Sequence, residues 1–113
     1  MNSKDKGKRG ERELAELLTE LMGVTHVRAA QVSGLYTADV VAIDDHSRPI
    51  PIGLHWECKR NEALNIYAAI EQAENDSKGD VPIVAHRRNN KPWLITIPLT
   101  RVKEFVTIMR EYL

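Results

Sequence analysis

The stretches YTADVVA (residues 36–42) and LHWECKR (residues 54–60) decide the fold of this 113-residue chain. The first is an apolar, β-branched run that opens with Asp39. The second is a short apolar run in which Glu57 and Lys59, two residues apart, point to the same face of a strand. We therefore expect two strands that bring two carboxylates and one amine together at one edge of a sheet.

Two acids and an amine in this arrangement suit a divalent metal ion held beside a phosphate group. Carboxylate oxygens bind hard Mg²⁺, which keeps several water molecules and takes phosphate oxygens as its remaining ligands. The amine of Lys59 would then orient the attacking water or offset negative charge on the phosphate. The two stretches predict metal-dependent chemistry on a phosphate.

Length and composition indicate one compact domain over residues 1–113, because 42% hydrophobic content supports a single core. Sixteen basic and sixteen acidic side chains cancel, so nucleic-acid binding would depend on local clusters. The single cysteine, Cys58, excludes an internal disulfide and a cysteine-based zinc site, and it fits a reducing cytoplasm. No apolar run approaches the roughly 18 residues of a membrane span, and the start is charged. We expect a soluble, cytoplasmic protein without a signal peptide.

The first residues are basic and are interrupted by glycines. We expect residues 1–9 to form a flexible basic arm, which either serves solubility alone or contacts phosphates. From about Gly10 the pattern becomes helical, and Gly23 is placed to end that helix. The apolar face of the helix is expected to consist of Leu14, Leu17, Leu18 and Leu21.

The remaining pattern alternates strands and helices. Apolar runs bounded by turn residues predict strands over residues 24–30, 38–43, 52–59, 81–86 and 93–97. Apolar residues at helical spacing predict a helix from about Ile66 to Ala73 and a last helix from Thr100, as its N-cap, to Leu113. In the third strand, Leu54, Trp56 and Cys58 should share one face, opposite His55, Glu57 and Lys59.

Asp39, together with Glu57-Cys58-Lys59, resembles the PD-(D/E)xK nuclease motif, in which an acid opens the second strand and E-x-K lies on the third. Ala38 stands where the motif has proline, a residue that shapes the strand entry and touches no metal. The resemblance implies an α/β protein with a restriction-endonuclease-like core, that is, a central mixed five-stranded sheet flanked by helices. It also implies Mg²⁺ as cofactor, with Mn²⁺ able to substitute, held by Asp39 and Glu57.

Residues 6–14, Lys6-Gly7-x-x-x-Glu11-Arg12-Glu13-Leu14, resemble the opening of the Holliday junction resolvase branch of these nucleases. The resemblance implies that Glu11 brings a further acid to the metal; otherwise Glu11 is a solvated first-turn glutamate favoured by the helix dipole. Gln72, in Glu71-Gln72-Ala73, resembles a glutamine that reaches toward the active site in that branch. The catalytic set is then Glu11, Asp39, Glu57 and Lys59.

Two further residues have open interpretations. Ser33 lies in the loop before the catalytic strand, where the resolvases often have a serine that contributes to cleavage; it is equally well an ordinary turn serine. His55 shares the face of Glu57, where it either touches a phosphate or the metal's outer ligands, or is only packed there.

Residues 82–93, with the pattern P-I-V-x-x-x-R-N-N-x-P-W, resemble the same region of bacteriophage-encoded relatives, which favours a viral or prophage origin. The turn inside this run is basic and could grip backbone phosphates or simply be soluble. Arg28 resembles the arginine that ends the first strand in the family. The candidate DNA-binding residues are Lys6, Lys8, Arg9, Arg12, Arg28, Arg60, Arg87, Arg88 and Lys91.

The resemblance implies a Mg²⁺-dependent endodeoxyribonuclease, most specifically a Holliday junction resolvase that cleaves four-way or otherwise branched DNA. Two alternatives stay open: a less selective phage nuclease acting in packaging or host DNA degradation, and a non-catalytic DNA-binding module on the same fold. A homodimer is expected, because a two-fold symmetric junction must be cut on two strands. Its interface could use Trp56, Trp93 and the helix face of Val102, Phe105 and Met109, unless these are core.

Overall fold

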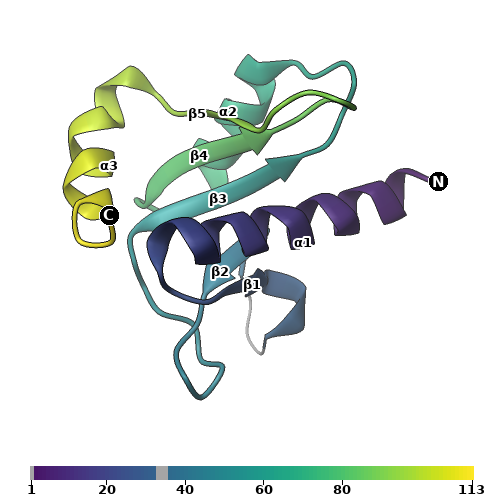
Figure 1. Cartoon of the computed structure of the whole chain (residues 1–113). Helices are drawn as coiled ribbons and strands as arrows, with labels where there is room; N and C mark the ends of the chain where they lie inside the picture. Colours follow the sequence, from purple (N-terminus) through teal and green to yellow (C-terminus); the bar gives the residue numbers. More distant parts are fainter. Residues whose placement is uncertain (1, 33–35) are drawn as a thin grey trace.

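The computed structural model describes residues 2–32 and 36–113, and it has the expected α/β architecture with a restriction-endonuclease-like core (Figure 1). A five-stranded mixed sheet is flanked by helices. Its strands, in spatial order, are β1 (His26–Arg28), β2 (Val40–Ala42), β3 (Leu54–Lys59), β4 (Val81–His86) and β5 (Leu94–Thr96). The helices are α1 (Ser3–Met22), α2 (Ile66–Asp76) and α3 (Val102–Met109), with short 3₁₀ turns η1 (Ala29–Gln31) and η2 (Leu99–Arg101).

The centre of the sheet is the parallel pair β3 and β4, which runs in register from Leu54 opposite Val81 to Lys59 opposite His86. Helix α2 makes the crossover that a parallel pair requires. The other neighbours are antiparallel. Strand β2 pairs with β3 only at Val40 opposite Trp56, so the two strands separate beyond this point.

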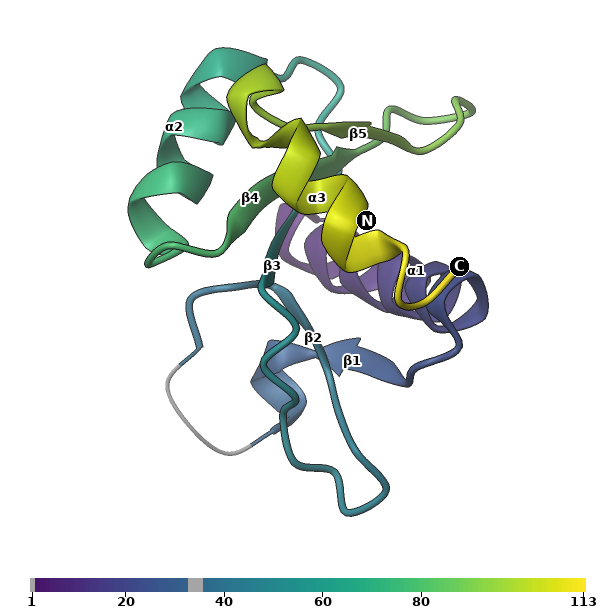
Figure 2. The same cartoon turned by 90° about the vertical axis from the view of Figure 1, so that its left-hand side faces the viewer.

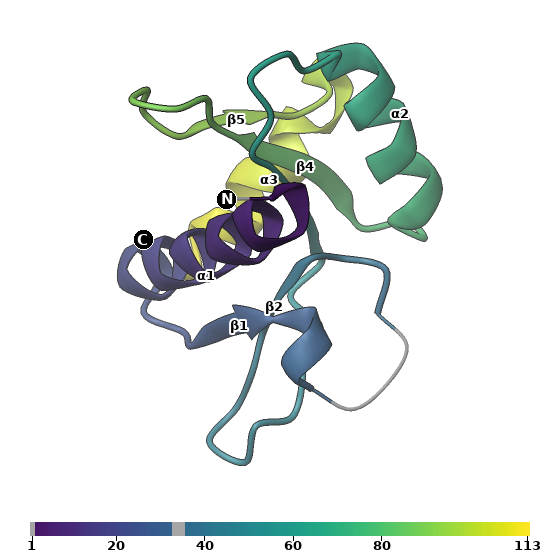
Figure 3. The same ribbon diagram turned by 90° about the vertical axis from the view of Figure 1, so that its right-hand side faces the viewer.

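Helices cover both faces of the sheet. Figures 2 and 3 show α1 and α3 on one side of β3 and β4, and α2 on the other. Trp56 and Ile83 lie in the cluster under α1, whereas Val84 packs against Ala69 and Ala73 of α2. The expected alternation along β3 is confirmed: Trp56 belongs to the larger core, and the side chains of His55 and Glu57 lie on the face of α2.

Helix α1 begins earlier than the sequence suggested. The side chain of Asn2 accepts a hydrogen bond from the Asp5 N–H at 2.9 Å, which caps the helix so that it starts at Ser3. Residues 3–9 therefore form its first turns, and the expected flexible arm over residues 1–9 is corrected. The end was predicted correctly: Gly23 adopts φ 69° and donates its N–H to the Thr19 carbonyl.

The buried face of α1 also differs from the expected row of leucines. Leu14 and Leu18 are buried, whereas Leu17 and Leu21 are 42% and 54% exposed. Met22 and Ala15 complete the buried face instead. The face of α1 that contacts the sheet is therefore narrower than the full set of its apolar residues.

Helix α3 starts at Val102 after η2, so the predicted N-cap at Thr100 is wrong, and the helix ends at Met109 rather than Leu113. The chain enters through a 3₁₀ turn closed by the Arg101 N–H and the Pro98 carbonyl at 2.9 Å, which removes the need for a side-chain cap.

The apolar residues considered for a dimer interface belong largely to the core. Trp56 and Met109 are buried, and Trp93 and Phe105 pack against the same cluster. Within residues 2–32 and 36–113, no helix has the length and apolar content needed to cross a membrane.

Candidate active site

Asp39 is fixed at the point where β2 and β3 meet. Its N–H donates to the Trp56 carbonyl at 2.9 Å, and its carbonyl accepts the Ala29 N–H at 2.9 Å. Its Oδ2 atom accepts the Cys58 N–H at 2.8 Å. The backbone of β3 therefore orients the carboxylate directly beside residue 57, as the sequence pattern predicted.

Glu57 is buried in the middle of β3, with only 3% of its surface exposed. Its Oε1 atom lies 2.7 Å from Nε2 of His55, which is equally buried. A carboxylate can only accept here, so Nε2 carries the proton in this contact. Burial disfavours the ionised form, but the hydrogen bonds with His55 and Asp39 and the charge of Lys59 outweigh it and lower the pKa of Glu57.

Asp39 has the opposite electrostatic balance. Burial, together with the nearby carboxylates of Glu57 and Glu11, raises the pKa of Asp39 to about 7, although the hydrogen bond from the Cys58 N–H opposes the rise. Burial, together with the carboxylates of Asp39 and Glu11, raises the pKa of the Cys58 thiol to about 12. Near neutral pH the carboxyl groups of Asp39 and Glu57 therefore share a proton. A metal cation bound between them would displace this proton.

Lys59 and Gln72 are brought together by α2. Nζ of Lys59 donates to Oε1 of Gln72 at 3.2 Å. The glutamine that the sequence singled out on the second helix thus lies against the lysine of the E-x-K motif. It can hold the amine in place without neutralising its charge.

Glu11 and Asp39 both line an open cavity of about 650 Å³. The η1 turn and the entry to β2 form much of its wall. Oε1 of Glu11 is 3.5 Å from Nε of Arg28, the one buried side-chain nitrogen or oxygen without a hydrogen bond among the described residues. Arg28, expected to contact DNA, is therefore turned toward Glu11.

The acids fit a magnesium ion only in part before substrate binds. Among the described residues, no group of three His, Cys, Asp or Glu side chains is ready to hold a metal. Asp39 and Glu57 offer two carboxylates, and Mg²⁺ commonly uses one or two, with waters and phosphate oxygens completing its shell. Burial and the neighbouring carboxylates raise the pKa of Asp39, and a cation bound beside it would favour its ionised form. This donor set suits Mg²⁺ beside a phosphate.

A family model described as "Phage putative PDDEXK endonuclease" matches residues 2–112. The chain belongs to this family. No curated protein and no solved structure matches it. Membership supports the PD-(D/E)xK superfamily, a phage origin and a nuclease, all of which the sequence pattern predicted.

Several arginines of this phage PDDEXK protein bind the protein itself. The stem of Arg60 crosses α1 at Gly10, where a Cβ would clash with its Cγ. Its guanidinium donates to the Arg87 carbonyl at 3.0 Å and to Oδ1 of Asn89 at 3.1 Å. Arg87 in turn pairs with Glu13 and donates to the Lys91 carbonyl. Arg60 and Arg87, both predicted to contact DNA, hold the β4–β5 turn against α1.

Other predicted DNA-binding residues remain at the surface. Arg88 and Lys91 are exposed and line a groove of about 580 Å³ beside the β4–β5 turn. On α1, Arg9 and Arg12 are exposed and Lys8 is half-buried, whereas Lys6 lies 3.5 Å from Glu62. Ser33 lies outside the described residues.

Sequence reasoning missed residues from two loops. Tyr36, Thr37 and Lys78 all line the cavity that holds Glu11 and Asp39. Lys78 belongs to the turn after α2 and has a positive φ of 52°. Oγ1 of Thr37 donates to the Asp76 carbonyl at 2.7 Å, which ties the entry of β2 to the end of α2. No local pattern signals this proximity, because the two loops are about forty residues apart in the chain.

Proposed function

We propose that this protein is a Mg²⁺-dependent endodeoxyribonuclease. The observation that carries the proposal is the convergence of Asp39 and Glu57 at the meeting point of β2 and β3, with Lys59 following on the same face. Membership in a family of phage endonucleases supports it. A structural role for this set is disfavoured, because two neighbouring buried carboxylates destabilise a fold unless a cation binds them.

Each side chain has a defined task in this proposal. Asp39 and Glu57 would hold the metal ion, which when bound polarises the phosphate and makes a bound water more acidic. Lys59, held by Gln72, orients the attacking water or offsets charge that develops on the phosphate. His55 fixes Oε1 of Glu57, so that the carboxylate keeps one orientation. Glu11 assists directly or through the metal's water molecules.

The substrate we favour is four-way or otherwise branched DNA, cut by a homodimer. Support comes from the resolvase-like opening of α1, whose Glu11 lines the same cavity as Asp39. A symmetric dimer would supply two sites for the two cuts that a junction needs. A less selective phage nuclease, acting in packaging or host DNA degradation, is the second candidate, because the family description names an endonuclease without naming a junction.

The test is cleavage of a four-way junction, a linear duplex of the same sequence, and the single strands, each with Mg²⁺, with Mn²⁺ and with EDTA. We expect metal-dependent cleavage, fastest on the junction. Paired nicks that linearise a cruciform plasmid, with a dimer in light scattering, would support the resolvase. Equal rates on all duplexes would favour the general nuclease. No cleavage of any DNA with either metal would leave only the DNA-binding module.

A further inference from the structure

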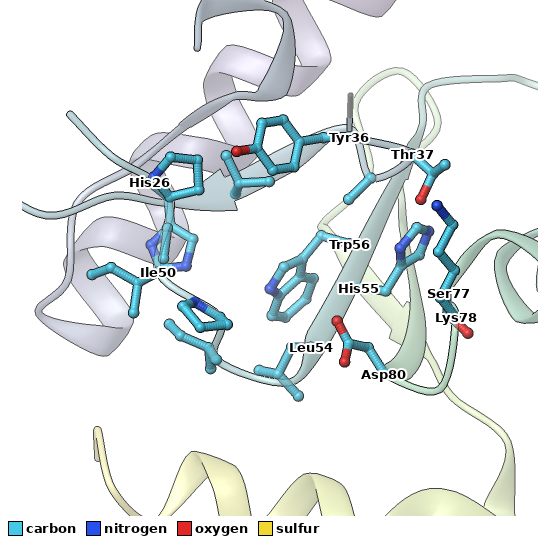
Figure 4. Close-up of a pocket in the computed structure, with 16 residues that line it drawn as sticks. His26, Tyr36, Thr37, Ile50, Leu54, His55, Trp56, Ser77, Lys78 and Asp80 are labelled. Atoms are coloured by element: carbon cyan, nitrogen blue, oxygen red, sulfur yellow. The ribbon is translucent and has the colours of Figure 1, made fainter. Parts of the chain in front are cut away.

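A second cavity, of about 370 Å³, lies next to the acidic one, where β2 and β3 separate (Figure 4). The segment from Pro49 to Ile52 forms one wall, and the first half of β3 forms another. The turn after α2 contributes Lys78 and Asp80 to the lining.

The walls of the cavity are apolar on one side and polar on the other. Ile50, Leu54 and the ring of Trp56 make the apolar side, and the carboxylate of Asp80 points inward beside them (Figure 4). His55 stands at the polar end with Nε2 bound to Glu57.

The two cavities are continuous in their lining. Tyr36, Thr37, Ala38 and Lys78 belong to both. Tyr36 is 41% exposed, and its ring lies over the second cavity (Figure 4). Among the residues that both linings share, Lys78 is the one with a positively charged side chain. A molecule with a phosphate at the acids could therefore extend past Tyr36 into the second space.

We propose that this cavity receives an unstacked nucleobase of the DNA strand whose phosphate lies at Asp39 and Glu57. The inference rests on the proposed nuclease function and adds to it a base-binding subsite. A nucleobase has flat apolar faces and a polar edge, which match the apolar wall and the carboxylate of Asp80. Tyr36 supplies the aromatic platform for stacking, and Lys78 contacts the phosphate between the two cavities.

The size and position of the cavity favour this ligand. Pockets for small organic groups span roughly 300 to 1,000 Å³, so a single base fits at the lower end. A base inside an intact duplex is stacked and paired, so it can enter the cavity only after it is unstacked and unpaired. The free-energy cost of this release is smallest at a branch or an unpaired site. The subsite would therefore select DNA with unpaired nucleotides near the cut.

The test compares a short single-stranded oligonucleotide with an oligomer of abasic nucleotides that has the same number of phosphates. Binding is measured by fluorescence anisotropy with Ca²⁺ in place of Mg²⁺, since Ca²⁺ takes the same oxygen ligands. We expect the wild type to prefer the intact strand by about tenfold or more, the range that stacking of one base gives. Tyr36→Leu, and Ile50→Trp, which fills the cavity, should reduce this preference to about twofold or less.

Two matched variants separate the subsite from other effects. Tyr36→Phe keeps the ring and should keep the preference. Tyr67→Leu removes an aromatic side chain that is 86% exposed on α2, away from the cavity, and should also keep it. Thermal unfolding of each variant checks that it folds.

The outcomes distinguish the two proposals. If the wild type cleaves DNA but Tyr36→Leu and Ile50→Trp retain the full preference for the intact strand, the base subsite is wrong and the nuclease stands. If the preference is lost in both variants while the wild type cleaves no DNA with Mg²⁺ or Mn²⁺, the subsite stands and the nuclease is wrong. A wild type that does not discriminate the two oligomers overturns the subsite in either case.

Discussion

The acidic cavity and the basic turn between β4 and β5 balance charge in opposite ways. Asp39 lines the cavity beside the buried Glu57, and burial, together with the carboxylates of Glu57 and Glu11, raises the pKa of Asp39. At the turn, Arg60 and Arg87 are bound by carbonyls and by Glu13. The fold thus pairs the arginines of the turn with groups of the protein, whereas Asp39 has no ion pair among the described residues at the place where a ligand is expected. The carboxylates of Asp39 and Glu57 therefore indicate the function better than the arginines of the turn do.

The largest effect is expected from the acids. Asp39→Asn or Glu57→Gln should lower the rate of DNA cleavage by about a thousandfold or more, because a metal ligand contributes several kcal/mol to the transition state. DNA binding should largely persist, since no basic side chain is removed. Cleavage assays on labelled junction DNA, together with binding assays, measure both quantities.

Asp45→Asn is the matched control, because Asp45 is an exposed carboxylate in the turn after β2 and should leave the rate unchanged. Cleavage by Asp39→Asn at the wild-type rate would show that the carboxylate pair is not catalytic.

Two glycines of α1 can test whether Arg60 holds the basic turn against this helix. At Gly10 a Cβ would displace Arg60 and break its two hydrogen bonds, whereas at Gly7 nothing lies within 4 Å of the added atom. Gly7→Ala should stabilise the protein through helix propensity, and Gly10→Ala should destabilise it. The expected difference in free energy of unfolding is roughly 2 kcal/mol.

Urea denaturation of the two alanine variants measures this difference. Equal stability would mean that Arg60 can move aside at no cost, and that the turn is not held by this contact.

The acidic cavity should also make the stability of the metal-free protein depend on pH. The folded protein binds a proton on Asp39 between the ordinary pKa of 3.8 and about 7, where the unfolded chain does not. Stability therefore falls as pH rises through this range. The lowered pKa of Glu57 acts only below its ordinary value of 4.5, so Asp39 dominates between about pH 5 and 7.5.

Asp39→Asn removes this proton, and the wild type should lose roughly 1 to 2 kcal/mol relative to the variant between about pH 5 and 7.5. Burial lowers the pKa of His26 and His86, which acts in the opposite direction, but both histidines are present in both proteins and cancel in the difference. Chemical denaturation at several pH values in EDTA gives the two curves. Parallel curves would contradict the raised pKa of Asp39.

The smallest effect is expected from the exposed part of the turn. Replacing Arg88 and Lys91 with alanine should weaken binding to a short duplex by about fivefold, and the salt dependence should fall by roughly one unit of slope per lost phosphate contact. Arg87→Ala should mainly reduce stability, because its guanidinium is bound to Glu13. A salt titration of binding distinguishes these results; identical slopes for the wild type and the double variant would mean that this surface does not bind DNA.

The sequence by itself determined the acid-bearing strands and the class of the fold. Alternation along β3, the apolar run of β4 over residues 81–86 and the glycine that ends α1 are local properties, because a strand period or a left-handed residue is set by neighbours in the chain. The placement of Asp39 beside residue 57 followed from the same logic, since two adjacent strands must meet at the start of β2.

Only the tertiary structure decided which leucines of α1 are buried, which arginines the protein uses for itself and where the second cavity opens. Each depends on groups that are distant in the chain: Arg60 reaches Gly10 and Asn89, and Lys78 joins Tyr36 at one rim. A sequence pattern records which side chains are available, but their partners are fixed by how helices and loops pack over the sheet. Contacts of this kind have no period along the chain, so they can be read only from the folded molecule.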